Sequence, residues 1–247
     1  MGNGRHSGLQ RTNGKRDSLP TGVKDISHKV DSDKYKIFTD KASGGWNYSG
    51  TGADVQDFFK KQSNLEDIIK SLSSSDVSAF GNWAVGGFMG SNKAEWNRLS
   101  PSEQRMLKIY DKVLDKSELY EGIVVRRLAS FSLVNNGSRD VPSDFASMEG
   151  NLVNVRMPLS ASAAAEGLTI GSWSKNVEYV IHIPSGSKGA GMWIGDYRIN
   201  SEWGPKQREF MVNRDTVFRQ GKTTYNSKRG VYEVELYYEG RTKHKYN

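Results

Sequence analysis

The stretch that decides the fold is GPKQREFMVNRDTVF, residues 204–218. It opens with a Gly-Pro turn, and Gln207 and Glu209 follow two positions apart. In extended backbone, side chains two positions apart point to the same face. The next three residues, Phe-Met-Val, form an apolar run short enough for a buried strand. The stretch therefore predicts an amide and a carboxylate side by side at the mouth of a strand, a placement that suits a functional site better than a core.

The composition sets the outer limits. The chain has 247 residues, of which 36% are hydrophobic, with a net charge of +7 and a pI of about 9.4. The low hydrophobic content predicts that part of the chain is unpacked tail, and the positive charge favours acidic partners such as nucleotide phosphates, nucleic acid or an acidic protein face. Cysteine is absent, which excludes disulfides and a thiolate nucleophile, and the four histidines lack metal-ligand spacing.

The chain divides into a tail and one domain. Residues 1–50 are polar and poorly periodic and predict a flexible basic tail or linker, whereas residues 51–247 predict a single domain. Within this domain, residues 51–119 predict a helical lead-in. Apolar residues between 53 and 72 recur at helical spacing, and the sequence SPSE at 100–103 predicts a capping box with proline at the first helical position.

Residues 120–247 predict the β-rich catalytic part of the domain. The β-branched runs at 122–128, 177–183 and 231–238 predict strands, whereas the Ala-rich run 160–166 predicts a short helix. Many short strands after a helical lead-in indicate an α+β fold with a mostly antiparallel sheet.

Three ordered motifs resemble those of a known family. Glu209 and the residues after it follow the pattern Glu-x-Leu-x-x-Arg-x-Thr-x-Phe, with Met in place of Leu. Upstream, Arg126 lies near the end of a predicted strand, and Ser172-Trp173-Ser174 follows later. Together they resemble the motifs of mono-ADP-ribosyltransferases of the Arg/Ser-Thr-Ser/Glu class, similar to clostridial Rho-modifying exoenzymes and to phage or bacterial toxin domains. The resemblance covers roughly the last half of the chain and implies a split sheet with NAD in the cleft between its halves.

The resemblance also implies the chemistry: NAD is a substrate, no metal takes part, and ADP-ribose moves to an acceptor once the nicotinamide–ribose bond is cleaved. The ribosyl cation needs a carboxylate aimed at it, the role of Glu209. Arg126 matches the arginine that grips the phosphates or ribose, and Arg127 would point to the opposite face, so only one of the two should enter the cleft. Ser172 matches the serine that orients the glutamate, and Ser174 would support the turn. The predicted NAD-binding residues are Arg126, Ser172, Trp173, Ser174 and Glu209, and Trp173 departs from the usual Thr.

Gln207 and Trp203 are predicted to recognise the acceptor. In the family, members with Gln at the position of Gln207 modify an asparagine or a guanine, whereas arginine-modifying members carry Glu, and an amide pairs well with another amide or a base edge. Trp203 could stack on a guanine or press against a protein surface. The predicted acceptor is a protein side chain of the Asn or Gln type. The alternative is a guanine base in nucleic acid, and NAD glycohydrolase activity is expected when an acceptor is lacking.

A rival from another class is a non-catalytic structural or binding module that kept the fold. Such a module would tolerate loss of Arg126, Ser172 or Glu209, and all three are present. We expect a monomer with no membrane span, because no apolar run approaches ~20 residues. No signal peptide is visible at the polar, glycine-rich start, yet a secreted or delivered effector, or a phage-associated protein, is expected rather than a resident cytoplasmic enzyme.

Overall fold

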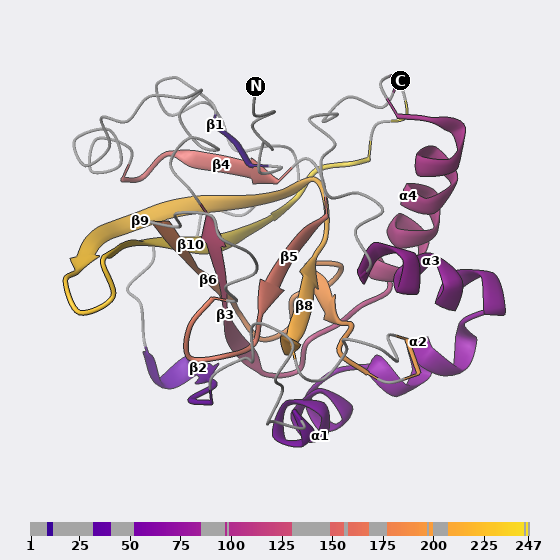
Figure 1. Cartoon of the computed structure of the whole chain (residues 1–247), viewed down its shortest axis with the longest axis horizontal. Helices are drawn as coiled ribbons and strands as arrows, with labels where there is room; N and C mark the ends of the chain where they lie inside the picture. The colour runs from indigo at the N-terminus through magenta and orange to yellow at the C-terminus, as the bar shows by residue number, and fades with distance from the viewer. Residues whose placement is uncertain are drawn as a thin grey trace.

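The computed structural model describes residues 9–11, 32–40, 52–84, 97, 99–129, 149–155, 158–167, 177–196, 198–199, 207–244 and 246. Figure 1 shows the α-helices along one side of the molecule and the long β9–β10 hairpin projecting from the other. In chain order the elements are β1 Leu9–Arg11, the 3-10 helix η1 Ser32–Lys34, β2 Tyr35–Ile37, α1 Ala53–Gln62, α2 Leu65–Ser71, α3 Ser74–Ala84, α4 Pro101–Leu114, β3 Gly122–Ala129, β4 Leu152–Val155, β5 Leu159–Ser162, β6 Val177–Ile183, β7 Gly191–Trp193, β8 Glu209–Val212, β9 Thr216–Asn226 and β10 Val231–Arg241.

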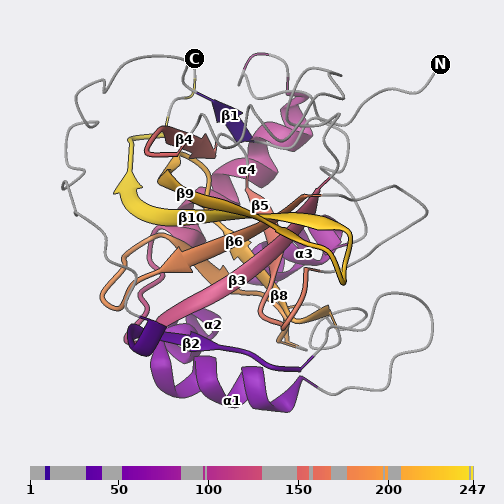
Figure 2. The same ribbon diagram turned by 90° about the vertical axis from the view of Figure 1, so that its left-hand side faces the viewer.

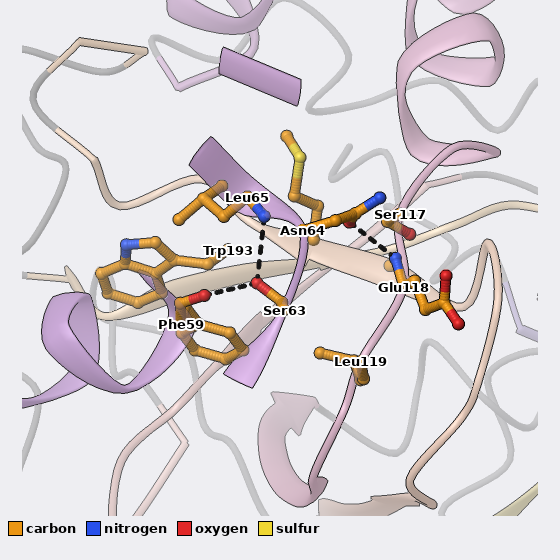
Figure 3. A pocket seen from close by; sticks show the side chains of 10 residues that line it. Phe59, Ser63, Asn64, Leu65, Ser117, Glu118, Leu119 and Trp193 are labelled. Carbon is orange, nitrogen blue, oxygen red and sulfur yellow. Dashed lines mark hydrogen bonds between the residues drawn. The ribbon is translucent and has the colours of Figure 1, made fainter. Parts of the chain in front are cut away.

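The helical run expected between residues 53 and 72 is broken into α1 and α2 by two polar residues. The hydroxyl of Ser63 donates to the carbonyl of Phe59 (2.5 Å) and accepts from the amide of Leu65 (3.3 Å). Next to it, Asn64 Oδ1 accepts from the amide of Glu118 (2.9 Å), as Figure 3 shows. Ser63 thus satisfies backbone groups where one helix ends and the next begins, while Asn64 ties the break to the segment after α4, and both contacts stabilise the break.

The N-terminus of α4 confirms the expected capping box. Ser100 Oγ accepts from the amide of Glu103 (3.3 Å), the Glu103 carboxylate accepts from the amide of Ser100 (2.6 Å), and Pro101 occupies the first turn. Reciprocal bonds of this kind satisfy two donors that a helix start otherwise leaves open. The helix then buries one apolar face, which includes Tyr110, in the core.

The sheet is split into two parts that meet at one point. Its strand order is β1-β4-β9-β10-β6-β3-β5-β8-β7, with β2 beside β3 (Figures 1 and 2). Neighbours are antiparallel except β10–β6 and β2–β3. Strand β3 pairs with β6 over seven positions, whereas it pairs with β5 only through Arg126 and Ser162. The α+β architecture with a split, mostly antiparallel sheet is therefore confirmed.

Strand β5 replaces the short helix expected at residues 160–166. Leu159–Ser162 pairs along its whole length with β8, and bends rather than a helix follow at 163–166. Alanine favours helices only weakly, by a few tenths of a kcal/mol over most residues. The ladder to β8 and the contact with β3 outweigh that local preference, so the helix prediction for this segment is wrong.

Residues 32–40 belong to the folded domain, in contrast to the tail expected for residues 1–50. Strand β2 pairs in parallel with the first half of β3, and Phe38 is buried against Phe58 and Phe59. A single aromatic side chain can bury 150–250 Å², enough to fix a short segment without any visible periodicity. Leu9–Arg11 also pairs with β4. The other residues of 1–50 lie outside the part of the chain that the structure describes, and their role as a tail remains a prediction.

Candidate active site

The single point of contact between the two parts of the sheet holds three polar residues in one row. Arg126 of β3 pairs with Ser162 of β5, and Ser162 pairs with Glu209 of β8. Residues that pair across neighbouring strands project to the same face of the sheet. Two predicted catalytic residues, Arg126 and Glu209, are thus placed on one row from opposite halves of the sheet, with Ser162 between them.

Glu209, the first residue of β8, is buried, with 5% of its surface exposed. Burial raises the pKa of the Tyr110 hydroxyl in α4, and the charge of Glu209 raises it further. For Arg127, burial lowers the pKa of the guanidinium, while the charge of Glu209 works in the opposite direction. A carboxylate held in such a low-dielectric place acts more strongly on a nearby positive charge than one in water.

The two neighbouring arginines of β3 have separate partners. Arg126 Nη1 donates to Glu178 Oε2 (2.8 Å), and Glu178 is fully buried, where it also accepts two bonds from Arg229 (2.7 and 2.8 Å). Arg127 Nη1 donates to the carbonyl of Ser160 (2.9 Å). The structure thus places both guanidinium groups close to the junction of the sheet, one bound to β6 and the other to β5.

The Gln207-x-Glu209 segment is a turn rather than the extended backbone expected from its spacing. Arg208 has a φ of 49°, in the left-handed region, and β8 begins only at Glu209. The carbonyl of Gln207 accepts from Ser162 Oγ (3.1 Å), and Gln207 itself is half-buried. Gln207 and Glu209 are two positions apart, but the prediction that their side chains share a face through an extended strand is wrong, because Arg208 between them turns the chain.

Four of the predicted site residues lie outside the described part of the chain. These are Ser172, Trp173, Ser174 and Trp203. Their positions relative to Glu209 therefore stay predictions.

The structure adds a serine that the sequence analysis missed. Ser160-Ala161-Ser162 has the same Ser-x-Ser spacing as Ser172-Trp173-Ser174, and its second serine is the one opposite Glu209. The Ser-x-Ser spacing could have identified this motif, but the alanines after it favour a helix, so the sequence predicted a helix here rather than a strand of the sheet. Arg208, buried within the turn, carried no signal at all.

Two pockets lie against helices α1 and α2. One small pocket lies under the α1–α2 break and is lined by Phe59, Leu65 and Trp193 among others (Figure 3). A groove of about 270 Å³ lies between β2 and α1 and includes Phe38, Phe58 and Asp54. Among the described residues no group of three or more acidic or histidine side chains could hold a metal ion, and no helix is long and apolar enough to cross a membrane.

Comparison with known proteins shows the fold. No family model and no curated protein sequence matches the chain. The solved structure of C3stau2 from S. aureus with NAD superimposes with a TM-score of 0.61 and 15% identity, covering 84% of this chain and 100% of that one. The fold is that of ADP-ribosyltransferases. The Clostridium limosum C3 exoenzyme superimposes with a TM-score of 0.60 and 16% identity, covering 84% of this chain and 98% of that one. Plx2a, an ADP-ribosyltransferase toxin from Paenibacillus larvae, superimposes with a TM-score of 0.53 and 17% identity, covering 76% of this chain and 94% of that one. The likeness to the ADP-ribosyltransferase fold thus extends well beyond the last half of the chain, from which the resemblance came.

Proposed function

We propose that the protein is an NAD-dependent mono-ADP-ribosyltransferase that transfers ADP-ribose to a protein side chain of the Asn or Gln type. The observation that carries the proposal is the row of Arg126, Ser162 and Glu209 at the junction of a sheet whose fold is shared with C3stau2, a protein solved with NAD. Like the toxin Plx2a, it would act as a delivered toxin or effector.

The residues of the row suit the proposed chemistry. Cleavage of the nicotinamide–ribose bond develops positive charge on the ribose, and the buried Glu209 carboxylate would stabilise that charge. NAD carries two phosphates, which the guanidinium group of Arg126 would attract. The Ser162 hydroxyl, which donates to the Gln207 carbonyl, would orient the Glu209 carboxylate through that turn. Nicotinamide then leaves, and the acceptor nitrogen, or water in its absence, forms the new bond to the ribose carbon.

Gln207 would contact the acceptor in this proposal. It is more exposed than Glu209, and only one residue separates the two. An amide acceptor group that loses its partner in a dry site costs ~1–3 kcal/mol, which corresponds to ten-fold or more in rate. Gln207→Ala should therefore lower transfer to a macromolecule about ten-fold and leave much of the NAD hydrolysis intact.

The test is incubation with labelled NAD, host-cell lysate and DNA, followed by protease or nuclease. Label that protease releases supports a protein acceptor, whereas label that only nuclease releases would replace it with a guanine-type acceptor. Calorimetry that shows no NAD binding at millimolar concentration, with no NAD turnover, would replace the enzyme by a non-catalytic module of the same fold.

A pair of variants tests which Ser-x-Ser motif serves the site. If Ser162 orients Glu209, Ser162→Ala should lower the kcat of NAD hydrolysis, with Ser160→Ala as the matched control on the same strand. If Ser172 has this role, as the motif order predicts, Ser172→Ala should give the loss instead. Both readings predict a change in kcat rather than in the KM for NAD, because the serine would act through the carboxylate.

A further inference from the structure

Arg208, the middle residue of the Gln207-x-Glu209 turn, is a buried arginine held by two aspartates from the N-terminal part of the chain. Its Nη1 and Nη2 donate to the two carboxylate oxygens of Asp54 (3.1 and 2.9 Å), and Nη2 also donates to Asp40 (3.1 Å). The Arg208 side chain is 6% exposed, whereas those of Asp54 and Asp40 are 51% and 64% exposed. Two-pronged arginine–carboxylate contacts fix orientation as well as distance.

The backbone of the same residue is held independently of its side chain. The carbonyl of Arg208 accepts from the amide of Ala163 (2.7 Å), and the carbonyl of Gln207 accepts from Ser162 Oγ (3.1 Å). A non-glycine residue in the left-handed region costs of order 1 kcal/mol and persists only where its surroundings determine it. Here the side-chain contacts to α1 and the backbone contacts to the end of β5 together supply that determination.

The other end of the chain segment that precedes Glu209 is anchored on the same helices. Gln56 of α1 donates to Asp196 (2.5 Å) and accepts from the indole of Trp193 (2.7 Å). Arg198 donates to Asp196 and also to Glu66 of α2 (2.8 Å). Asp196 and Arg198 on one side and Arg208 on the other are therefore anchored on α1 or α2.

We propose that Arg208 is a positioning residue, and that its contacts with Asp54 and Asp40 set the turn that presents Gln207 to the acceptor and Glu209 to the ribose. This inference rests on the proposed transferase function. In this proposal α1 holds the turn in place through Asp54, although it supplies no group to the reaction. Displacement of a catalytic group by about 1 Å can cost a hundred-fold in rate, so loss of these contacts should lower kcat much more than it raises the KM for NAD.

The experiment compares Asp54→Ala with Asp54→Glu in the full-length protein. Asp54 is half-exposed and Arg208 keeps Asp40 as a partner, so loss of the Asp54 carboxylate should leave the fold intact. We expect Asp54→Ala to lower the kcat of NAD hydrolysis about ten- to a hundred-fold with less than about a three-fold change in KM, and Asp54→Glu, which keeps the carboxylate, to restore part of it. Arg208→Gly, which tolerates the left-handed backbone but has no side chain to bind aspartate, should behave like Asp54→Ala.

A matched control and a readout without turnover separate positioning from stability. Arg219→Lys alters another ion pair, Arg219–Glu239 on β9 and β10 (2.7 Å), in which Glu239 is buried and Arg219 partly exposed, and should leave kcat unchanged at a comparable loss of stability. Hydrogen exchange at the Ala163 amide, which binds the Arg208 carbonyl, should quicken in Asp54→Ala and stay as in wild type in Arg219→Lys. Wild-type protein that turns over no NAD overturns the proposed function and this inference together. Active wild type with an unchanged kcat in Asp54→Ala, or with an equal loss in Arg219→Lys, overturns the positioning role alone.

Discussion

The two ends of β8 are held by similar contacts in different surroundings. Before the strand, Arg208 binds Asp54 and Asp40, whose carboxylates are half-exposed or more. After the strand, Arg214 binds Asp111 of α4 through two bonds of 2.7 Å, and both side chains are buried. A surface carboxylate loses little hydration when it pairs, whereas a buried pair is costly to break. We therefore expect the Arg214 end to stabilise the strand, and the Arg208 end, next to Gln207 and Glu209, to position it.

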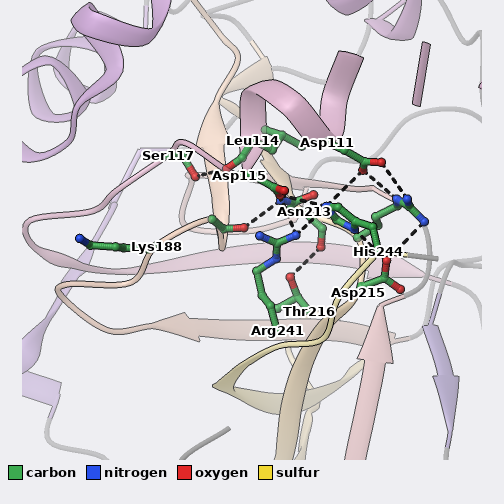
Figure 4. Close-up of polar contacts among 12 residues, drawn as sticks. Asp111, Leu114, Asp115, Ser117, Lys188, Asn213, Asp215, Thr216, Arg241 and His244 are labelled. Atoms are coloured by element: carbon green, nitrogen blue, oxygen red, sulfur yellow. Dashed lines mark hydrogen bonds and ion pairs between the residues drawn. The ribbon is translucent and has the colours of Figure 1, made fainter. Parts of the chain in front are cut away.

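The Arg214 end is surrounded by a wider polar network, drawn in Figure 4. His244 lies between Asp215 (2.9 Å to Nδ1) and Asp115 (2.9 Å to Nε2). Arg241 contacts Asp115 (2.7 Å) and His244 (2.8 Å). The network ties the segment after β10 to the C-terminal end of α4 and to the turn after β8, so it links three distant parts of the chain.

Removal of the buried partner should have the largest effect on stability. Asp111→Ala leaves Arg214 as a poorly compensated buried charge, and we expect a loss of about 3–5 kcal/mol in the free energy of unfolding. Asp54→Ala at the other end should cost less, about 1–2 kcal/mol, because the buried Arg208 guanidinium keeps its bond to Asp40 and both of its carboxylate partners are reached by water. Denaturant unfolding of both variants measures the difference, and similar losses would contradict the distinction between the two ends.

Catalytic loss should be concentrated at the Arg208 end. Glu209→Gln keeps the shape of the side chain but removes its charge, and we expect a loss of ~2–4 kcal/mol of transition-state stabilisation with the fold and most NAD affinity retained. Glu233→Gln, in the Glu-x-Glu sequence 233–235 on β10, is the control and should be nearly silent. Single-turnover NAD hydrolysis gives the comparison. Should the two variants exchange their effects, the catalytic motif would be the one on β10.

A pH-dependent contribution should come from the Arg214 end alone. Burial by itself would lower the pKa of His244, but its bonds to Asp115 and Asp215 and the charge of Asp111 raise it above the ordinary value, although Arg214 opposes this. For Asp115, burial alone would raise the pKa, but the bonds from His244 and Asn213 and the charge of Arg241 lower it. The histidine contribution is thus complete below about pH 6.5 and is lost as the pH rises through the raised value, while that of Asp115 is lost only in acid.

His244→Gln should therefore lower the free energy of unfolding by about 1–2 kcal/mol at pH 6, the size of a hydrogen bond to a charged group. The difference from wild type should shrink toward pH 9 as His244 loses its proton, while the charge contacts of Asp111 and Arg241 persist in both proteins. Unfolding curves at the two pH values test this. A difference that stays constant or grows with pH would show that His244 is held as the neutral imidazole.

The sequence predicted the fold best where the signal is local. The Ser100 capping box depends on residues three apart, and β6 and β10 depend on continuous β-branched runs. Long-range contacts decided the rest. Phe38 joins the core because β2 pairs with β3, and the alanines after Ser160 form a strand edge because β8 is adjacent. Propensity is too weak to override such pairing.

For the site, the order of the sequence motifs identified Arg126 and Glu209, the two ends of the row, but not Ser162 between them. Glu209 and Arg126 were found because their motifs are contiguous with strands. Ser162 was missed because its neighbours favoured a helix. The role of Arg208 could not have been predicted from the sequence, because it depends on contacts with Asp40 and Asp54, more than 150 positions away. A charged residue between two site residues is ordinarily solvated, and only the fold shows that this one is buried.

The place of β10 in the sheet has a consequence for how the protein reaches its native state. Residues 231–241 are synthesised after all the other strands, yet β10 lies between β9 and β6 and pairs in parallel with the latter. Until it arrives, β1, β4 and β9 have no neighbour through which to join β6 and β3. Pairings between distant segments of a chain form slowly, because a long loop must close first. The sheet can therefore be completed only after residues 231–241 have left the ribosome, and until then β9 and β6 each lack the neighbour that β10 provides.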